Sequence, residues 1–198
     1  MAHKRNEAFD RDYYKRFYED PKTRVVAPEE SERLIRFVAS YFAFLDVPVG
    51  DVLDLGCGVG LWRDGINRLD LDWDYRGVEH SAWACDEFGW EQGSVVDYDG
   101  GPADLVVCQG VLQYLPDSNC EKALRNLARL YKAALFLEVL TEEDWREACD
   151  TGLSDGAVHR RPAAFYLDAL RPTFRRIGGG VFLRRDLGVS LFSLETCD

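Results

Sequence analysis

The sequence predicts a doubly wound α/β fold with a mostly parallel seven-stranded sheet that ends in an antiparallel strand. From residue 49 onward, short apolar runs alternate with segments of helical periodicity, which is typical of a sheet covered by helices. The run 103–108 is apolar at consecutive positions, as expected for a parallel strand buried on both faces. A glycine-rich loop follows the first run directly, at the position where ligands bind in such sheets.

Residues 1–48 are expected to form an N-terminal helical cap. Aromatic residues spaced by four place 9–18 on one helix, which ends before a proline. A second helix begins at Pro28, because proline suits the first turn and the two glutamates after it favour the positive end of the helix. Its apolar face extends to Leu45.

Residues 49–198 are expected to form the sheet domain, packed with the cap as one compact unit. Strands are assigned to short apolar runs and helices to segments with apolar residues three and four apart. The expected strands are 51–55, 74–79, 93–96, 103–108, 133–140, 174–177 and 189–194. The expected helices between them are 61–69, 82–88, 120–131, 142–149 and 162–170. The loops after the first four strands should therefore line one site.

Composition excludes several classes of protein and partner. The net charge of -11 disfavours DNA or RNA, whose binding depends on Lys and Arg contacts to phosphates. The sequence shows no apolar run near the roughly 20 residues that span a bilayer and no secretory signal, so we expect a cytoplasmic protein without a membrane partner. The 6 cysteines are scattered and the 3 histidines lie far apart, which predicts reduced thiols and no metal site.

Arginines are concentrated between residues 160 and 185. We interpret them as exposed helix and strand faces, with a cationic rim that binds an acidic substrate group as the alternative. The sequence does not indicate an oligomeric state.

The glycine-rich loop is the most informative motif. It is the run Asp54–Gly60, with glycines at positions 56, 58 and 60. A dinucleotide-binding loop has the spacing G-x-G-x-x-G and would need a glycine where this chain has Leu61. The G-x-G-x-G spacing instead gives a compact loop, in which bare backbone can approach a ligand that has no phosphate.

This loop resembles the first motif of the class I S-adenosylmethionine-dependent methyltransferases. Glu79, at the end of the next strand, matches the acidic residue with which that family accepts hydrogen bonds from both ribose hydroxyls. The segment 103–115 is similar to the region after the family's fourth strand, which implies that Gln109 lies beside the cofactor. The resemblance covers residues 49–139 and implies a Rossmann-like fold with S-adenosylmethionine as cofactor. In this part of the chain the expected cofactor-binding residues are Asp54, Gly56, Cys57, Gly58, Glu79, His80, Ser94, Val95 and Gln109.

The residue that would contact adenine is ambiguous. Members of the family commonly carry Gly-Asp-Ala after the third strand, with the aspartate at the adenine amino group. This chain reads Gly93-Ser94-Val95-Val96-Asp97, so that alignment on the glycine puts Ser94 in the place of the acid. Asp97 lies three residues further along, and the sequence leaves both open.

Residues 12–25 are similar to the N-terminal lid of several small-molecule methyltransferases. By this resemblance Tyr14 would shield the sulfonium from water, and Arg24 would pair with the methionyl carboxylate. The alternative is an amphipathic helix followed by an exposed arginine.

A general base is needed only if the acceptor atom keeps a proton. His159, in the glycine-containing connection 154–159, is the first candidate because an imidazole titrates near neutral pH. The alternative is a solvent-exposed loop histidine. Tyr114 is the second candidate, and Glu138 is a third for which a structural role is favoured.

These features predict an S-adenosylmethionine-dependent methyltransferase that acts in line on a small-molecule acceptor. Two alternatives are a non-catalytic S-adenosylmethionine-binding subunit and a nicotinamide-dependent oxidoreductase, the latter disfavoured by Leu61. A protein substrate with a basic segment is also compatible with the acidic surface. The acceptor atom is not encoded in any motif.

Overall fold

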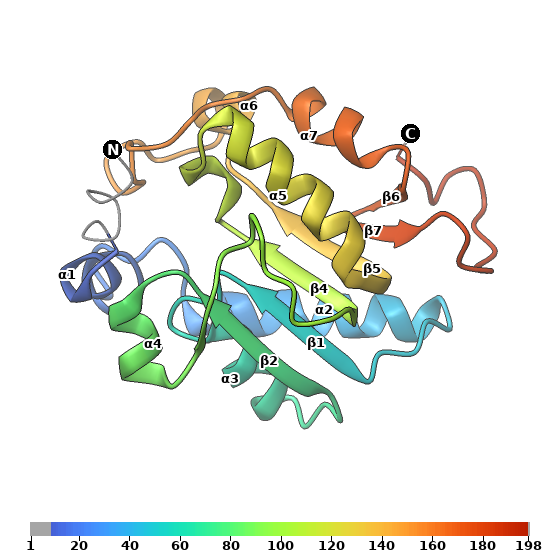
Figure 1. The fold of residues 1–198 in the computed structure, drawn as a ribbon, viewed down its shortest axis with the longest axis horizontal. Coiled ribbons are helices and arrows are strands. Elements are labelled where there is room, and N and C mark those ends of the chain that lie inside the picture. The colour runs from blue at the N-terminus through green and yellow to red at the C-terminus, as the bar shows by residue number, and fades with distance from the viewer. Residues whose placement is uncertain (1–8, 198) are drawn as a thin grey trace.

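A seven-stranded sheet forms the centre of the molecule in this computed structural model, which describes residues 9–197 (Figure 1). Its strand order is β3-β2-β1-β4-β5-β7-β6. The strands are β1 Asp51–Leu55, β2 Asp74–Glu79, β3 Glu91–Gln92, β4 Ala103–Gln109, β5 Tyr131–Glu138, β6 Phe174–Gly178 and β7 Val181–Arg184. Strands β1 to β5 pair in parallel, whereas β7 is antiparallel to both β5 and β6. The predicted fold class is confirmed.

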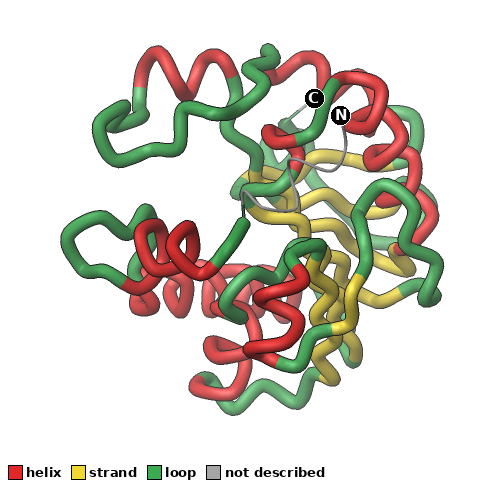
Figure 2. The backbone as a smooth tube through the Cα atoms, turned by 60° about the vertical axis from the view of Figure 1, so that its left-hand side comes forward, coloured by secondary structure: helices red, strands yellow, loops and turns green. Residues whose placement is uncertain are grey.

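Helices cover both faces of this sheet, and the strands form a layer between them (Figure 2). The α-helices are α1 Arg11–Tyr14, α2 Pro28–Phe44, α3 Leu61–Arg68, α4 Ala82–Phe88, α5 Asp117–Leu130, α6 Glu142–Glu147 and α7 Ala163–Leu170. A π-helical turn, η2 Lys15–Glu19, continues α1, and a 3-10 turn, η3 Leu112–Tyr114, follows β4. Within the described residues, each helix is too short or too polar to cross a membrane.

Alternation along the central strands creates a separate hydrophobic core on each face. On β1, Leu53 packs with the helices α5 and α7, while Val52 packs with α2 and α3. On β4, Val106 packs in the core with α5 and α7, and Leu105 packs in the core with α2 and α3. Side chains of adjacent strand residues point to opposite faces, so one apolar run can serve both layers. Burying each Leu or Val side chain contributes roughly 1.5–3 kcal/mol.

The parallel registers bring four strand ends to one edge of the sheet. Leu55 lies opposite Val78, and Gln109 lies opposite Glu138. The loops that follow β1, β2, β4 and β5 therefore start side by side. This is the carboxyl edge, where ligands of such sheets bind.

The described helices of the N-terminal 48 residues lie in two different places. Helix α2 packs into the core, with Ile35 and Val38 fully buried. Helix α1, capped by Asp10 through the N–H of Tyr13, lies near α4 beyond the carboxyl edge (Figure 1). Stacking of Tyr14 on Trp83 at 5.3 Å between ring centroids joins α1 to α4.

Two expected strands are placed differently by the structure. The third strand is β3, two positions ahead of the predicted start at residue 93. The last strand is β7 rather than 189–194, because Gly178–Gly180 have positive φ values of 89°, 58° and 77° and turn the chain tightly after β6. Val189 and Leu191 still pack against the core, but without strand pairing.

Candidate functional site

The glycine-rich loop leaves β1 with a backbone conformation that requires glycine. Gly56, Gly58 and Gly60 have φ values of 87°, 54° and 84°. Space is also limited, since a Cβ atom on Gly56 would lie 2.3 Å from a methyl carbon of Val111. The N–H of Gly56 donates to the carbonyl oxygen of Val78 at 2.8 Å, which holds the loop against β2. The G-x-G-x-G spacing thus produces a tight turn, and Gly56 and Gly58 of this turn border a cavity.

A cavity of about 640 Å³, here called cavity 1, lies next to this loop. Its volume is in the range of small-molecule sites, roughly 300–1,000 Å³. The predicted cofactor-binding residues that line it are Tyr14, Gly56, Gly58, Glu79, His80, Ser94, Val95 and Gln109. The fold therefore brings together residues from four separate loops and the N-terminal helix.

Glu79 is a buried carboxylate at the end of β2, with 6% of its surface exposed. One oxygen accepts the N–H groups of His80 and Ser81 at 2.7 and 3.0 Å, and the other accepts the N–H of Gly58 at 2.8 Å. A carboxylate has about four acceptor positions, so this arrangement leaves one for a ligand donor. The expected pair of ribose hydroxyls would thus have to share that position or displace a backbone donor.

The structure separates the two candidates for the adenine contact. Ser94 lines cavity 1, and its hydroxyl accepts the N–H of Val96 at 3.2 Å. Asp97 lies at the surface in a shallow hollow with Lys122 and Arg125. The turn in which the N–H of Asp97 donates to the carbonyl oxygen of Ser94 carries the acid away from cavity 1.

A second cavity of about 470 Å³, cavity 2, adjoins the same loop, because Gly56 and Gly58 line both cavities. Both cavities are lined by Tyr13, Tyr18, Gln109 and Tyr114. Cavity 2 also receives Asp54, Cys57 and Glu138 from the ends of β1 and β5. The two cavities therefore meet at the carboxyl ends of the central strands.

Asp54 is buried, with 2% of its surface exposed, and its Oδ2 accepts the hydroxyl of Tyr75 at 2.7 Å. Burial raises the pKa of Asp54 to about 7 despite this hydrogen bond. A positively charged ligand group nearby would favour the ionised form. Burial likewise raises the pKa of the Cys57 thiol, which is neutral at physiological pH.

Glu138 is oriented by a chain of side-chain hydrogen bonds. Gln109 donates through Nε2 to both carboxylate oxygens of Glu138, each at 3.3 Å. The indole N–H of Trp62 in turn donates to Oε1 of Gln109 at 2.8 Å. Glu138 is open to cavity 2, yet the surrounding protein still raises its pKa by desolvation.

Tyrosines from α1 and η2 cover the junction of the two cavities. The hydroxyl groups of Tyr13 and Tyr114 lie 2.9 Å apart, and Tyr14 is buried. Burial raises the pKa of both Tyr13 and Tyr14, so these phenols stay neutral. Arg24 follows the tyrosines in the chain but does not line either cavity.

The two candidate bases have different positions. Tyr114 lies at the junction of the cavities, and burial raises its pKa. His159 lines neither cavity, although its N–H donates to the carbonyl oxygen of Gln113 at 2.7 Å. Asp155 and Val158 do line cavity 2, so the predicted connection borders the site, although His159 itself lines neither cavity.

Two residues that support the site gave no signal in the sequence. Arg161 is only 4% exposed, which contradicts its interpretation as part of an exposed arginine face. It pairs with Asp117 at 2.8 Å and donates to the carbonyl oxygens of Leu112 and Leu115, which braces one wall of the cavities. Trp90 donates its indole N–H to the carbonyl oxygen of Gly58 at 2.8 Å. Their partners lie 32 to 49 positions away in the sequence, beyond the reach of local patterns.

The cysteines and acidic residues show no further type of site. All cysteines, Cys57, Cys85, Cys108, Cys120, Cys149 and Cys197, are free thiols. In residues 9–197, His, Cys, Asp and Glu side chains form no group of three or more that could hold a metal ion.

Comparisons with known proteins identify a family and a fold for this chain. A model of the methyltransferase domain family matches residues 21–178. A search of curated proteins found no match. Among solved structures, magnesium protoporphyrin IX methyltransferase from Synechocystis with bound SAH is 18% identical, with a TM-score of 0.59 over 93% of this chain and 100% of that chain.

Two further structures show the same fold. A sugar N-methyltransferase from Streptoalloteichus is 18% identical, with a TM-score of 0.59 over 87% of this chain and 93% of that chain. An S-adenosylmethionine-dependent methyltransferase from Clostridium acetobutylicum is 10% identical, with a TM-score of 0.59 over 99% of this chain and 96% of that chain. At such identities the likeness concerns the fold alone.

Proposed function

The chain belongs to the class I S-adenosylmethionine-dependent methyltransferases, and we propose that it transfers a methyl group in line to a small-molecule acceptor. This membership sets aside the nicotinamide-dependent oxidoreductase. The observation that carries the proposal is the meeting of cavity 1 and cavity 2 at the glycine-rich loop. One cavity can hold the cofactor and the other the acceptor, with the transferred group at their junction.

The residues around cavity 1 fit the cofactor. Glycines at 56 and 58 leave the loop without side chains where a ligand would approach, and Glu79 keeps one acceptor position for a hydroxyl donor. Ser94 and Val95 would line the adenine end, and Asp54 would face the cationic methionyl end from cavity 2. When bound, S-adenosylmethionine supplies an electrophilic methyl group on a sulfonium leaving group.

The protein's own contribution to the reaction is alignment and exclusion of water. Tyr13, Tyr18 and Tyr114 surround the junction of the cavities, where they would limit solvent access. The hydrogen bond between the Tyr13 and Tyr114 hydroxyls ties α1 and η2, residues 11–19, which form the helical part of the expected lid, to the wall after β4. Orienting two reactants in contact can supply a large part of a displacement barrier, roughly 7–11 kcal/mol in favourable cases.

The test uses two measurements on the full chain. Calorimetric titration with S-adenosylhomocysteine should give a saturable site, and titration with NAD should not. Incubation with S-adenosylmethionine labelled in its methyl group and a metabolite extract should then give a labelled small product, which mass spectrometry identifies. Tight cofactor binding without any labelled product would instead favour the non-catalytic subunit, and labelling of protein alone would favour a protein acceptor.

A further inference from the structure

Cavity 2 carries acidic side chains without a basic counterpart. Its lining includes the carboxylates of Glu30, Asp54, Glu138 and Asp155. Within the described part of the chain, no lysine, arginine or histidine contributes to that lining. Glu30 is engaged locally, because its Oε2 accepts the N–H of Ala27 at 2.8 Å and so caps α2. No cationic side chain of the described residues balances the other three, so a ligand in this cavity meets an acidic surrounding, in which Asp54 is only partly ionised at neutral pH because burial raises its pKa to about 7.

The cofactor of the proposed function accounts for only part of this acidic surrounding. It carries a sulfonium and an ammonium group against one carboxylate, and Asp54 is the first residue of the loop that would hold it. Glu138 and Asp155 come from other segments, the end of β5 and the connection after α6. Asp155 accepts the N–H of Ala157 at 2.9 Å. Among the described residues, Glu138 accepts only the neutral amide of Gln109, so Glu138 is the carboxylate most available to the acceptor.

Two unpartnered polar atoms around the same cavity, an amide oxygen and a hydroxyl oxygen, can each accept a hydrogen bond from a ligand. Gln113 is 7% exposed, and its Oε1 has no hydrogen-bond partner among residues 9–197. Ser31 is 3% exposed, and its hydroxyl is likewise unpartnered in that range. Both residues line cavity 2. Such buried polar groups are costly to leave unpaired unless a ligand satisfies them.

Aromatic rings also line cavity 2, and they favour a cationic ligand. Tyr13, Phe17, Tyr18 and Tyr114 all contribute to the lining of cavity 2. The face of an aromatic ring attracts a cationic group through its quadrupole. An ammonium group offers N–H donors, no acceptor and a positive charge, and so matches the carboxylates, the amide oxygen and the rings together.

We propose, resting on the proposed function, that the acceptor is a small molecule with a basic amine, which Glu138 binds and deprotonates. The ammonium gives one proton to an oxygen of Glu138, which frees the nitrogen lone pair. The nitrogen then forms the new C–N bond as the C–S bond breaks, and that bonding pair stays on sulfur. Gln109 holds the Glu138 carboxylate in place through its paired contacts. Desolvation raises the pKa of Glu138, which makes it a better proton acceptor than an ordinary glutamate.

The test compares ligands that differ in one group. Protein saturated with S-adenosylhomocysteine is titrated in a calorimeter with phenethylamine and with phenethyl alcohol, and then with a series of smaller amines down to ethylamine. At least one amine should bind about tenfold or more tightly than its alcohol, because a hydrogen bond to a charged partner adds that much. In an assay with labelled S-adenosylmethionine, the same amine should become methylated.

Two variants locate the effect. Glu138→Gln keeps the shape of the side chain and should reduce the preference for the amine to about twofold, while the affinity for S-adenosylhomocysteine stays unchanged. Glu121→Gln is the matched control, since Glu121 is exposed on α5 and lines neither cavity, and it should keep the full preference. If Glu138→Gln does not fold, Asp155→Asn should also reduce the preference.

Other results would contradict the proposal that the acceptor is a small amine. Equal binding of every amine and its alcohol, or no binding of any amine to the loaded protein, would overturn this inference and leave the proposed function intact. Methylation of a lysine-rich peptide but of no free amine would overturn the small-molecule source. Failure to bind S-adenosylhomocysteine would overturn the proposed function itself and this inference with it.

Discussion

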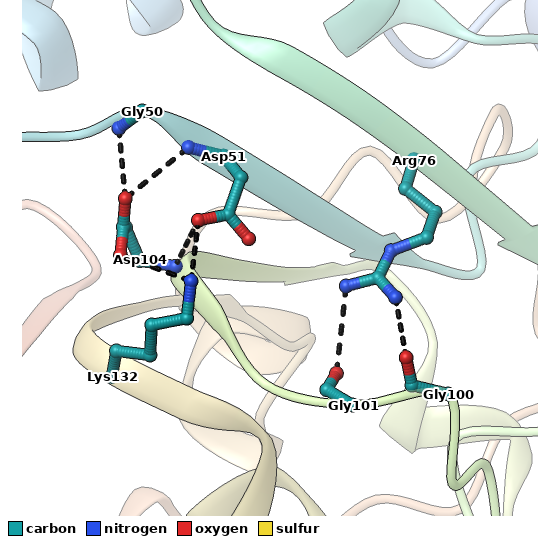
Figure 3. A network of polar contacts seen from close by, with 7 residues as sticks. All are labelled: Gly50, Asp51, Arg76, Gly100, Gly101, Asp104 and Lys132. Atoms are coloured by element: carbon teal, nitrogen blue, oxygen red, sulfur yellow. Dashed lines mark hydrogen bonds and ion pairs between the residues drawn. The ribbon is translucent and has the colours of Figure 1, made fainter.

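The two edges of the parallel sheet carry carboxylates in opposite situations. At the amino edge, where the strands begin, Lys132 Nζ lies 2.7 Å from Asp51 and 3.4 Å from Asp104, and Asp104 also accepts the N–H of Gly50 (Figure 3). At the carboxyl edge, Asp54 and Glu138 face a cavity to which no cationic side chain of residues 9–197 contributes. The carboxylates at the amino edge are paired with a lysine of the chain, whereas those at the carboxyl edge have no cationic side chain of residues 9–197 beside them in the cavity.

The pKa shifts follow this difference. Partial burial acts to raise the pKa of Asp104, but hydrogen bonds from Gly50 and Asp51 and the nearby Lys132 lower it overall. Burial dominates at Asp54 and raises its pKa to about 7. Polar groups that the fold leaves incompletely paired are concentrated where a ligand is expected, which is the usual place for such local conflicts. The amino edge stabilises the fold, and the carboxyl edge is open to the ligand that we propose.

The largest effect is expected at Asp54. Its pKa of about 7 lies above the ordinary 3.8, so the associated stability is fully present below about pH 4 and is lost as the pH rises through about 7. A shift of about three units corresponds to about 4 kcal/mol. Asp54→Asn keeps an oxygen for Tyr75 but cannot ionise. Its free energy of unfolding relative to wild type should therefore rise by about 4 kcal/mol between about pH 4 and pH 8. Urea unfolding at several pH values checks this, and parallel curves for the two proteins would contradict it.

The next largest effect concerns cofactor affinity at the carboxyl edge. Glu79→Ala should raise the dissociation constant for S-adenosylhomocysteine by about tenfold to a hundredfold, because a hydrogen bond to a charged group is worth about 1.5–3 kcal/mol. Calorimetric titration with S-adenosylhomocysteine measures this dissociation constant. Asp51→Ala at the amino edge is the control and should change the affinity by less than about twofold. Unchanged affinity in a folded Glu79→Ala protein would remove Glu79 from the site.

A smaller effect is expected when the hydroxyl contact between lid and wall is removed. Tyr13→Phe should destabilise the contact with Tyr114 by about 0.5–1.5 kcal/mol, seen as faster hydrogen exchange in residues 11–19. Tyr41→Phe is the matched control, since it loses a hydroxyl bond of 2.9 Å to the carbonyl oxygen of Ile177, far from both cavities. If residues 11–19 exchanged hydrogen at the same rate in the two variants, the bond between Tyr13 and Tyr114 would not stabilise this segment.

The smallest effect is expected at the amino edge itself. Lys132 is about half exposed, with 47% of its side-chain surface accessible, so solvent screens its ion pairs. Lys132→Ala should lower the free energy of unfolding by about 0.2–1 kcal/mol, and less at high salt. Its affinity for S-adenosylhomocysteine should equal that of wild type. A loss of affinity as large as that of Glu79→Ala would erase the distinction between the two edges.

Local patterns predicted the elements whose cause is local. The spacing of apolar residues predicted α2, β1 and β4, because burial on one face or on both leaves a periodic trace. The strand β7 was missed, since its four residues become a strand only through pairing with β5 and β6. In the site, Glu79 was predicted because it ends a recognisable strand and matches the acidic residue that the resembled family carries there. The environments of Glu138 and Arg161 depend on partners 29 and 44 positions away and left no local trace.

By itself, the sequence determined the α/β fold, the glycine-rich loop and the acid at the tip of β2, because glycine conformation and strand periodicity are properties of short segments. The tertiary structure alone decided that Ser94 rather than Asp97 lines cavity 1, and that Glu138, Asp155 and Gln113 surround cavity 2. Burial and pairing of a side chain depend on what distant segments bring beside it, and no local spacing records that.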